Sequence, residues 1–371
     1  ASMIPESRRD EVVIAGGGMA GIVAASTLAR AGVPVLLIDE NEYLGGQYLR
    51  FPSPVLGPSL GREHERERRL GLELAAGLAG HKVLLLNHSR ILGVYPDREL
   101  LVESDGQRTM AIHAQFLLLA PGARERFLPF PGWTLPGVLS TGALQSLLRG
   151  QSILPAESIV LAGSGLFLLA AAAETVRAGG KVTAVLEATP LARKLGLLRP
   201  LLALPARWTE ELGHLATLLA HRVPLRHRSV VVRAEGEGRL ERIVTARLDN
   251  HGKPIEASER TLPCDCLALG GGFAPNIELA QLAGIGPVFD PSRGGWVIPV
   301  SDSQETEVEH VYAAGEITGI VGAAGARIEG EIAARAILRA MGRGSGDEDD
   351  RQLARLRRQR QRLIAFAGRF N

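Results

Sequence analysis

Cysteine is nearly absent from this sequence: Cys264 and Cys266 are its only two cysteines in 371 residues. Two thiols cannot build the disulfide framework of a small secreted protein, and they are too few to hold a four-thiolate iron–sulfur cluster within the chain. Cys264-Asp265-Cys266 also has no histidine close by in the sequence, which disfavours a zinc site. We expect two buried free thiols at the head of a strand, with both sulfurs facing one side, in a reducing compartment.

The sequence also lacks a strong excess of one charge and a long apolar run. Forty-two Lys and Arg residues against 40 Asp and Glu residues give a formal net charge of +2. So small a net charge disfavours nucleic acid and anionic lipid as partners. No uninterrupted apolar run reaches the ~18 residues of a membrane helix, and the N-terminal residues contain no signal-peptide core. We therefore expect a cytoplasmic protein without a membrane span.

Motifs of two other enzyme classes are missing as well. The nine histidines show no HExxH or similar spacing, so the sequence predicts no metal site. No GxSxG elbow supports a hydrolase. The length of 371 residues is sufficient for two packed domains.

A glycine-rich fingerprint lies near the N-terminus of the sequence. It reads Gly16-Gly17-Gly18-Met19-Ala20-Gly21, follows an apolar run over 12–15, and is followed by Asp39 at the end of a second apolar run. The first glycine permits a tight turn, the second lets the backbone approach a pyrophosphate, and the third lets the helix pack on the strand. Asp39 stands where its carboxylate can accept the ribose hydroxyls. This pattern predicts a βαβ unit that binds a dinucleotide, either FAD or NAD.

The far end of the chain favours FAD. Val311-Tyr312-Ala313-Ala314-Gly315-Glu316 follows an expected strand, and Gly322, Ala323 and Ala324 begin the next expected helix. In FAD enzymes such a strand places an acid against the ribitol chain, and the helix directs its N-terminus at the flavin pyrimidine edge. The usual acid is Asp, so Glu316 is one methylene longer.

Gly45-Gly46-Gln47 occupies the stretch that runs beneath the flavin in two-nucleotide flavoenzymes. In disulfide reductases this stretch carries a redox cysteine pair, which is missing here, so dithiol chemistry is disfavoured. Gln47 has two interpretations, as a hydrogen-bonding partner of flavin or substrate, or as an exposed loop glutamine.

A second fingerprint, Gly163-Ser164-Gly165-Leu166-Phe167-Leu168, is damaged. Leu168 takes the place of the third glycine, which pushes the helix away from the strand, whereas the first two glycines still permit a phosphate to approach. Three interpretations stay open: a distorted NADH site, a site for another adenine nucleotide, or a structural relic. The candidate residues for a second nucleotide, ATP or NAD, are Gly163, Gly165, Leu166 and Glu187.

The rest of the pattern predicts further elements around these two units. We expect strands over 82–86, 91–95, 100–103 and 111–119 to form an antiparallel meander with a return strand. Other expected elements are a loop over 52–62, helices over 63–79 and 191–221, a Pro-rich linker over 127–138, strands over 229–234, 240–248, 262–269 and 310–314, and a helix ending near Met341.

The tail after a polar spacer alternates arginine with Leu353, Leu356, Leu363 and Ile364 on one helical face. It is interpreted either as a solvated surface helix or as a docking helix for a partner subunit, and we favour docking. The acidic run over 347–350 disfavours a polyanion-binding arm, because it opposes the same charge.

Several of these segments together resemble the alpha subunits of hetero-oligomeric, dye-linked amino-acid dehydrogenases. They are the first fingerprint, Gly45-Gly46-Gln47, the run from Ala120-Pro121-Gly122 through Arg124-Glu125-Arg126 to Phe130-Pro131-Gly132-Trp133, and Gly271-Gly272-Phe273-Ala274-Pro275-Asn276. The family includes D-hydroxyproline and L-proline dehydrogenases, opine oxidases and hydrogen cyanide synthase. The resemblance covers residues 10–341.

The resemblance implies an α/β, glutathione-reductase-like flavoprotein with two Rossmann-like βαβ domains, the first of them discontinuous. It implies an FAD-binding domain over 3–126 and 268–342, an NAD-binding-like domain over 127–267, and a spacer and docking helix over 343–371. The residues expected to bind FAD are Gly16, Gly18, Met19, Ala20, Gly21, Asp39, Glu40, Gly46, Gln47, Ala120, Gly122, Gly315, Glu316, Gly322, Ala323 and Ala324.

The function implied is an electron-transfer subunit that receives electrons from an amine-oxidising flavoprotein beta subunit and passes them to an external acceptor. Many relatives continue into a Cys-rich domain with a two-iron two-sulfur cluster, so we expect a small iron–sulfur subunit to carry that cluster here. Two alternatives stay open: a stand-alone NAD(P)H-dependent flavin reductase of the ferredoxin-reductase type, and a non-catalytic scaffold that holds a nucleotide. No catalytic residue is assigned, because residues that contact the amine are expected on another chain.

Overall fold

The computed structural model describes residues 6–49, 62–78, 80, 82–190, 205–344 and 346–368. The chain divides into two compact units. Unit 1 comprises Ala1–Phe51, Arg66–Arg124 and Phe273–Asn371, and unit 2 comprises Pro52–Glu65 and Glu125–Gly272. The expected loop lies outside the described residues except for Arg62, and so does the first part of the helical stretch expected over 191–221.

Unit 1 is built on a seven-stranded sheet in the order β3-β2-β1-β6-β5-β4, with β19 also paired to β6. Strand β2 is buried along its whole length, which is typical of a strand covered on both faces. The strands are β1 (Glu6–Ala15), β2 (Val35–Ile38), β3 (Val83–Leu86), β4 (Ser89–Tyr95), β5 (Glu99–Ser104), β6 (Arg108–Leu119) and β19 (Val311–Ala313).

One sequence expectation about this sheet was wrong. Strand β3 does not belong to an antiparallel meander but pairs in parallel with β2, with Val83 opposite Val35. Only β4, β5 and β6 form the meander, and β6 returns in parallel beside β1. The meander therefore extends a parallel β3-β2-β1-β6-β19 core.

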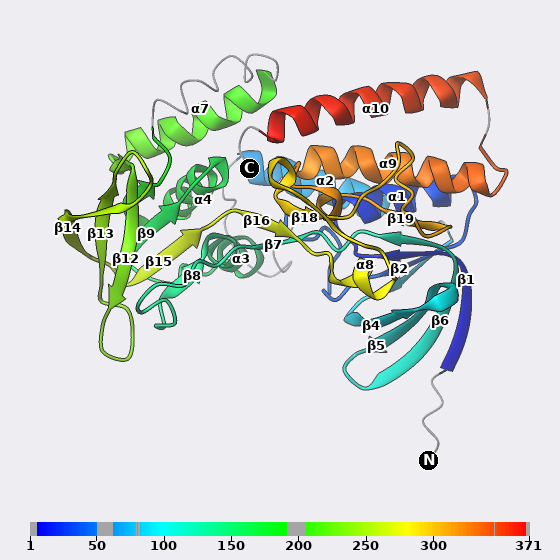
Figure 1. The fold of residues 1–371 in the computed structure, drawn as a ribbon, viewed down its shortest axis with the longest axis horizontal. Helices are drawn as coiled ribbons and strands as arrows, with labels where there is room; N and C mark the ends of the chain where they lie inside the picture. Colours follow the sequence, from blue (N-terminus) through cyan, green and yellow to red (C-terminus); the bar gives the residue numbers. More distant parts are fainter. Residues whose placement is uncertain are drawn as a thin grey trace. The chain divides into compact units, whose positions relative to one another are not determined.

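Helices cover one face of this sheet, and α10 forms a further layer (Figure 1). The residues of α1, α2 and α9 pack with β1, β2 and β6 in one cluster, while the meander and α8 pack on the opposite face. Leu353 and Leu356 of α10 pack on Ile332 of α9. The helices of unit 1 are α1 (Met19–Arg30), α2 (Arg62–Ala76), α8 (Glu278–Leu282), α9 (Ala323–Ala340) and α10 (Asp347–Ala367).

Short elements complete unit 1. The hairpin β17–β18 is antiparallel, and β16 pairs with β7. Their bounds are β7 (Ala123–Glu125), β16 (Phe273–Pro275), β17 (Val288–Asp290), β18 (Gly295–Val297), and the 3-10 helices η1 (Pro96–Arg98), η2 (Pro291–Arg293) and η3 (Glu316–Thr318).

Unit 2 is a second parallel sheet, in the order β11-β10-β9-β15-β8. Helices α3, α4 and α7 pack on one face, and an antiparallel three-stranded sheet, β12-β13-β14, packs on the other. The sheet strands are β8 (Val138–Ser140), β9 (Ser158–Gly163), β10 (Lys181–Glu187), β11 (Leu225–His227) and β15 (Cys266–Gly270). The other elements are α3 (Thr141–Gln151), α4 (Leu166–Arg177), α7 (Pro205–Ala220), β12 (Ser229–Glu235), β13 (Arg242–Leu248) and β14 (Pro254–Pro263).

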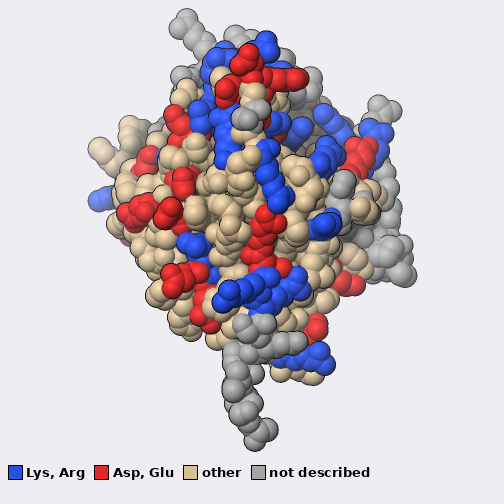
Figure 2. Space-filling view, turned by 90° about the vertical axis from the view of Figure 1, so that its right-hand side faces the viewer, with Lys and Arg blue, Asp and Glu red and all other residues tan. Residues whose placement is uncertain are grey.

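Charged residues of both signs are interspersed on the face that Figure 2 shows. No large area of one sign dominates that view, which agrees with the formal net charge of +2. In addition, none of the described helices is long and apolar enough to cross a membrane.

Candidate functional site

The first fingerprint forms the turn between β1 and α1. Gly16 has a φ of +108°, and a Cβ there would collide with the carbonyl oxygen of Ala120. A Cβ at Gly21 would collide with the carbonyl oxygen of Gly16, so the helix can start this close to the strand only with glycine at position 21. A Cβ at Gly18, by contrast, would meet no atom of the described residues within 4 Å. The turn is therefore closed on the protein side and open beside Gly18.

Helix α1 presents a free N-terminus at this opening. Its N-cap is Gly18, no side chain caps it, and its first turn contains no acidic residue. The N–H groups of a first helical turn have no partner within the helix and carry a partial positive charge, which makes them suited to a phosphate group. Open space beside an uncapped helix N-terminus fits the pyrophosphate of a dinucleotide.

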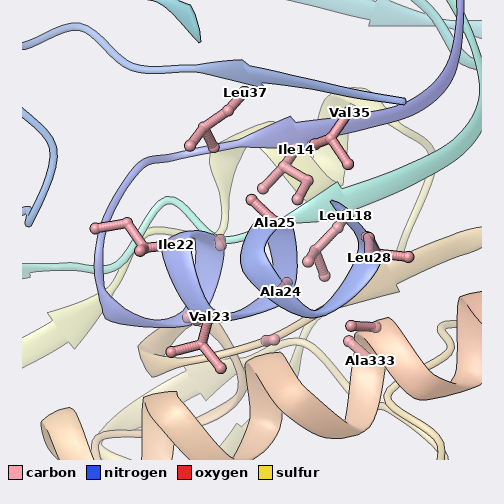
Figure 3. Packing of buried hydrophobic residues seen from close by; sticks show 14 of the residues in the cluster. Ile14, Ile22, Val23, Ala24, Ala25, Leu28, Val35, Leu37, Leu118 and Ala333 are labelled. Atoms are coloured by element: carbon pink, nitrogen blue, oxygen red, sulfur yellow. The ribbon is translucent and has the colours of Figure 1, made fainter. Parts of the chain in front are cut away.

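The body of α1 is held rigidly behind this N-terminus. Figure 3 shows Ala25 of the helix next to Ile14 of the sheet, and Ile22 and Leu28 belong to the same buried cluster as Val35, Leu37 and Leu118. The opposite side of the helix approaches α9, where a Cβ at Gly330 would collide with the backbone of Ala20. The close helix pair fixes the direction of the α1 N-terminus.

The Gly45-Gly46-Gln47 segment lies against the fingerprint turn. The N–H of Gly45 donates to the carbonyl oxygen of Gly17 over 2.8 Å, and a Cβ at Gly46 would lie 3.0 Å from the Cα of Gly18. Gln47 follows with an exposed side chain. The segment predicted to run beneath the flavin, which contains the candidate residues Gly46 and Gln47, therefore lies beside the fingerprint turn.

Asp39 shapes the turn itself. Its Oδ2 accepts the N–H of Gly17 over 2.6 Å, and its Oδ1 accepts the backbone and side-chain nitrogens of Asn41, each over 2.8 Å. The residue is 8% exposed, whereas Glu40 beside it is exposed. Because the Asp39 oxygens already accept these hydrogen bonds, Glu40 is the acid more accessible to a ribose.

Ala120 and Gly122 lie close to the same turn. The N–H of Ala120 donates to the carbonyl oxygen of Ala15 over 2.8 Å. Asn276 holds the next two residues, since its Nδ2 donates to Pro121 O over 3.0 Å and its backbone N–H donates to Gly122 O over 3.1 Å. The segment 271–276, part of the family resemblance, therefore includes a residue that braces the predicted nucleotide-binding turn.

The Gly315-Glu316 turn follows β19, and Glu329 of α9 stabilises it by hydrogen bonds. Glu329 Oε2 accepts the N–H of Gly315 and the hydroxyl of Thr318, each over 2.8 Å. Glu329 Oε1 accepts Arg360 Nε over 2.7 Å. Neither Glu329 nor Arg360 was predicted as a site residue. The only sequence feature that could have drawn attention to Glu329 is its place beside Gly330, in a helix rich in small residues.

Glu316 is the exceptional acid of this site. Burial raises its pKa from 4.5 to about 7, although a hydrogen bond from the Gly322 N–H favours the charged form; the nearby negative charge of Glu329 raises it further. Glu316 can therefore exchange a proton near neutral pH, or donate a hydrogen bond when it is protonated.

The N-terminus of α9 lies next to Glu316. Gly322 is its N-cap, no side chain caps it, and its first turn has no acidic residue. Ala323 is partly exposed and Ala324 is exposed. Unit 1 therefore contains two helices whose N-termini no side chain caps, α1 and α9. The prediction needs both in one unit, since α1 is expected to bind the pyrophosphate of FAD and α9 to face its flavin ring.

The second fingerprint departs from the first at its third glycine position and at the end of the following strand. Leu168 is 1% exposed and packs among Leu144, Leu148 and Ile159, so it is a core residue. Glu187 is 0% exposed, its Oε1 accepts the N–H of Thr189 over 3.0 Å, and the residue after it is Ala188. In the part of the chain that the structure describes, no atom lies within 4 Å of a Cβ added at Gly165. The opening for a phosphate is kept, but no exposed acid stands at the end of the strand.

The two cysteines are free and buried, as expected. Their predicted placement on one side of a strand was wrong: Cys264 precedes β15 and packs with Leu267 in one cluster, while Cys266 packs with Ala268 in another. Burial raises the pKa of each thiol to about 12. Among the described residues, no group of His, Cys, Asp or Glu could hold a metal ion.

Comparisons with known proteins agree with this geometry. The family model for pyridine nucleotide-disulphide oxidoreductases matches residues 10–337. The hydrogen cyanide synthase subunit HcnB of Pseudomonas aeruginosa is 36% identical over 333 residues, which is 88% of this chain and 70% of HcnB. An opine oxidase subunit of Rhizobium meliloti strain 1021 is 31% identical over 342 residues, covering 90% of this chain and 72% of that protein.

A solved structure, the L-proline dehydrogenase from P. horikoshii, superimposes with a TM-score of 0.66 at 19% identity and covers 95% of this chain and 60% of that chain. This likeness confirms the predicted α/β fold class of a flavoprotein with two dinucleotide-binding-type units. The family resemblance inferred from the sequence motifs is also confirmed.

Proposed function

The chain belongs to the pyridine nucleotide-disulphide oxidoreductase family and is an oxidoreductase, and we propose on that basis that it is the FAD-binding electron-transfer subunit of a hetero-oligomeric dehydrogenase. Its substrate class is an amino acid or related amine of the hydroxyproline, proline or opine type. A partner flavoprotein oxidises that amine, and a small iron–sulfur subunit carries electrons onward. The observation that carries the proposal is the 36% identity to a protein that is itself a subunit, HcnB.

Unit 1 supplies the FAD site in this proposal. The N-terminus of α1 binds the pyrophosphate beside Gly18, and Glu40 accepts the ribose hydroxyls while Asp39 holds the turn. Bound FAD supplies the capacity to take up two electrons and to release them one at a time. Glu316 binds the ribitol chain, and the positive end of α9 stabilises negative charge at the flavin pyrimidine edge.

Dithiol chemistry does not fit these residues, despite the family name. Gly45-Gly46-Gln47 contains no thiol, and the only two cysteines of the sequence are buried in unit 2. Raised pKa values of about 12 keep both sulfurs in the unreactive thiol form. Electrons must therefore reach the flavin by another route than a disulfide pair.

The second fingerprint indicates whether NADH or a partner subunit donates the electrons. With Leu168 in the core and Glu187 fully buried, unit 2 lacks the third glycine and the accessible acid that a nicotinamide dinucleotide uses. Delivery of electrons from a partner subunit is consistent with that loss. A second nucleotide such as ATP could still place a phosphate beside Gly165.

One observation favours a second candidate function, an NAD(P)H-dependent flavin reductase. Gly163 and Gly165 are both kept, and the space beside Gly165 is open. These features would admit the pyrophosphate of NADH even without a ribose-binding acid. The two candidates differ in the electron donor, which can be tested directly.

Purification of the chain with an affinity tag from its native operon tests the leading proposal. We expect a second flavoprotein to co-purify in constant ratio, and FAD to be released from the complex on denaturation. Mass spectrometry of the released cofactors also identifies any second nucleotide. A chain that purifies alone and is fully active alone would contradict the proposal.

A further inference from the structure

The acidic residues of helix α10 lie in its first turn, and its arginines follow along the rest of the helix. Its first turn carries four acidic residues, Asp347 to Asp350. Asp349 forms ion pairs with Arg335 and Arg339 of α9, with 2.9 Å between Arg339 Nη2 and Asp349 Oδ2, and Asp350 also pairs with Arg339. No Asp or Glu follows in the sequence after Asp350. The helix therefore uses acids to attach itself to α9, and the rest of its length is cationic.

Two arginines of α10 face the protein. Arg360 is 8% exposed and bonds Glu329. Arg357 donates from Nε to Asp302 O over 2.9 Å and from Nη2 to Ser303 Oγ over 3.0 Å. Leu353 and Leu356 pack on the same side. This inner face accounts for the attachment of the helix to unit 1.

Four other arginines, Arg351, Arg355, Arg358 and Arg362, are all exposed. Their spacing of four, three and four residues places them on one side of the helix, along about 16 Å of its length at about 1.5 Å a residue. No carboxylate among the described residues forms an ion pair with any of the four, and Arg351 bonds only a backbone carbonyl, that of Asp347. Four arginines in one row without a carboxylate partner form a strip of positive charge, which favours contact with an anionic surface.

We propose that this four-arginine face of α10 is a docking surface for an acidic protein partner. The proposal rests on the proposed function, since it assigns a surface to the electron-carrying partner of the same complex. Guanidinium groups pair with carboxylates in two parallel hydrogen bonds, and arginine is enriched in protein interfaces. The partner chemistry is a row of Asp and Glu side chains that matches the row of arginines.

A protein fits this surface better than nucleic acid or a membrane. The chain has a formal net charge of only +2, and the acidic turn at 347–350 begins the same helix. Long polyanions need an extended basic area, because each phosphate contact adds to affinity and an acidic turn repels the next phosphate. A compact acidic patch needs only the length of the four arginines, so it can end before the acidic turn, whereas a long polyanion runs on past it.

The inner face of α10 connects such a partner to the flavin turn. Arg360 lies on that face and bonds Glu329, which holds Gly315 and Thr318. A partner bound to the outer face therefore lies against the helix that braces the predicted ribitol-binding turn.

Charge reversal tests the surface in the native complex. We expect Arg355→Glu combined with Arg358→Glu to weaken retention of the iron–sulfur partner at least tenfold and to reduce its salt dependence. Arg9→Glu combined with Arg108→Glu is the matched control, since both residues are exposed on unit 1 and change the net charge equally. Flavin content and thermal unfolding midpoint should be unchanged in both double variants, which shows that folding is intact.

A photo-cross-linking amino acid in place of Arg358 identifies what touches the surface. We expect cross-links to an Asp- and Glu-rich peptide of a co-purifying protein. Cross-links to nucleic acid or lipid, or a complex whose affinity is equal in the two double variants, would overturn the proposal while leaving the proposed function intact. Absence of any co-purifying protein with the unchanged chain would overturn both.

Discussion

Arg360 of α10 donates from Nε to Oε1 of Glu329 over 2.7 Å, in a region where Glu329 is 1% exposed. The other oxygen of Glu329 holds Gly315 and Thr318 on either side of Glu316. A residue near the end of the last helix thus fixes the turn that carries the predicted ribitol-binding acid. Hydrogen bonds thus connect α10, α9 and the turn after β19, three elements that are distant from one another in the sequence.

The first prediction concerns that ion pair. Arg360→Leu should lower the free energy of unfolding of the flavin-free protein by about 3 kcal/mol, because it leaves a buried carboxylate without its cation. Arg357→Leu is the control on the same helix face, and it should cost about 1 kcal/mol or less because its guanidinium bonds only uncharged oxygens. Urea unfolding followed by circular dichroism measures both.

The double variant Glu329→Gln with Arg360→Leu should recover part of the lost stability, because the buried carboxylate that lost its ion-pair partner is then replaced by a neutral amide. Equal costs for Arg360→Leu and Arg357→Leu would show that the Glu329 pair contributes nothing special. The release rate of FAD, measured by fluorescence, should rise with Arg360→Leu and stay near its normal value with Arg357→Leu.

The second prediction separates folding from cofactor binding at the fingerprint. Gly18→Ala adds a Cβ where none of the described residues has an atom within 4 Å, so it should change the unfolding free energy by about 1 kcal/mol at most. The same methyl group stands where a pyrophosphate would lie, so flavin content should fall at least tenfold. Gly21→Ala should instead destabilise the protein itself by more than about 2 kcal/mol, because its Cβ collides with Gly16.

Absorbance of the bound flavin and urea unfolding of the flavin-free protein measure the two effects separately. If Gly18→Ala kept its full flavin content, the pyrophosphate could not lie beside Gly18. If Gly21→Ala were as stable as the unchanged chain, the close start of α1 on β1 would be wrong.

The third prediction uses the raised pKa of Glu316, about 7 against an ordinary 4.5. Below pH 4.5 the folded and unfolded chains both carry the proton, so this group has no effect on stability. As the pH rises, the unfolded chain loses its proton first, and stability falls until the folded carboxyl also ionises near pH 7. Glu316→Gln removes this loss.

The variant and the unchanged flavin-free chain should therefore have nearly equal urea midpoints at about pH 5, and Glu316→Gln should be the more stable at about pH 8. The difference should grow between those two values. Parallel curves over the whole range would mean that Glu316 ionises normally. Glu309→Gln, at an exposed acid, makes the same substitution on the surface and serves as the control variant.

The fourth prediction concerns the two cysteines. With pKa values of about 12 and buried sulfurs, neither thiol should react with iodoacetamide in the native protein at pH 8 within hours, whereas both should react in urea. Replacement of Cys264 and Cys266 by alanine should leave electron transfer unchanged. Loss of electron transfer in a well-folded variant would point to thiol chemistry after all.

Much of the fold follows from local sequence patterns. The two βαβ units, the paired glycines and the strand before Gly315 were predictable because glycine spacing and apolar runs report local backbone requirements. The pairing of β3 with β2 was missed, although the continuous run Val83–Leu86 is typical of parallel strands. Strand β14 was also missed, since nearly all of its side chains are exposed and show no alternation.

The supporting residues of the site were beyond this kind of prediction. Glu329 and Arg360 are 31 residues apart, and nothing in their immediate surroundings marks them as a pair. Helix α10 was expected to follow a polar spacer, but it begins within the acidic run, because Asp349 and Asp350 pair with α9 and favour a helix N-terminus. Such contacts depend on the packing of distant elements and become visible only in the folded chain.

In the proposed function, electrons reach the flavin from another subunit and not from a nicotinamide bound at the second fingerprint. The direct test is anaerobic mixing of the isolated, FAD-loaded chain with NADH and with NADPH, while the flavin absorbance is followed. We predict no bleaching over many seconds with either nucleotide, although dithionite should bleach the same sample fully. Prompt bleaching by NADH or NADPH would contradict the account and would make this chain a nicotinamide-dependent flavin reductase.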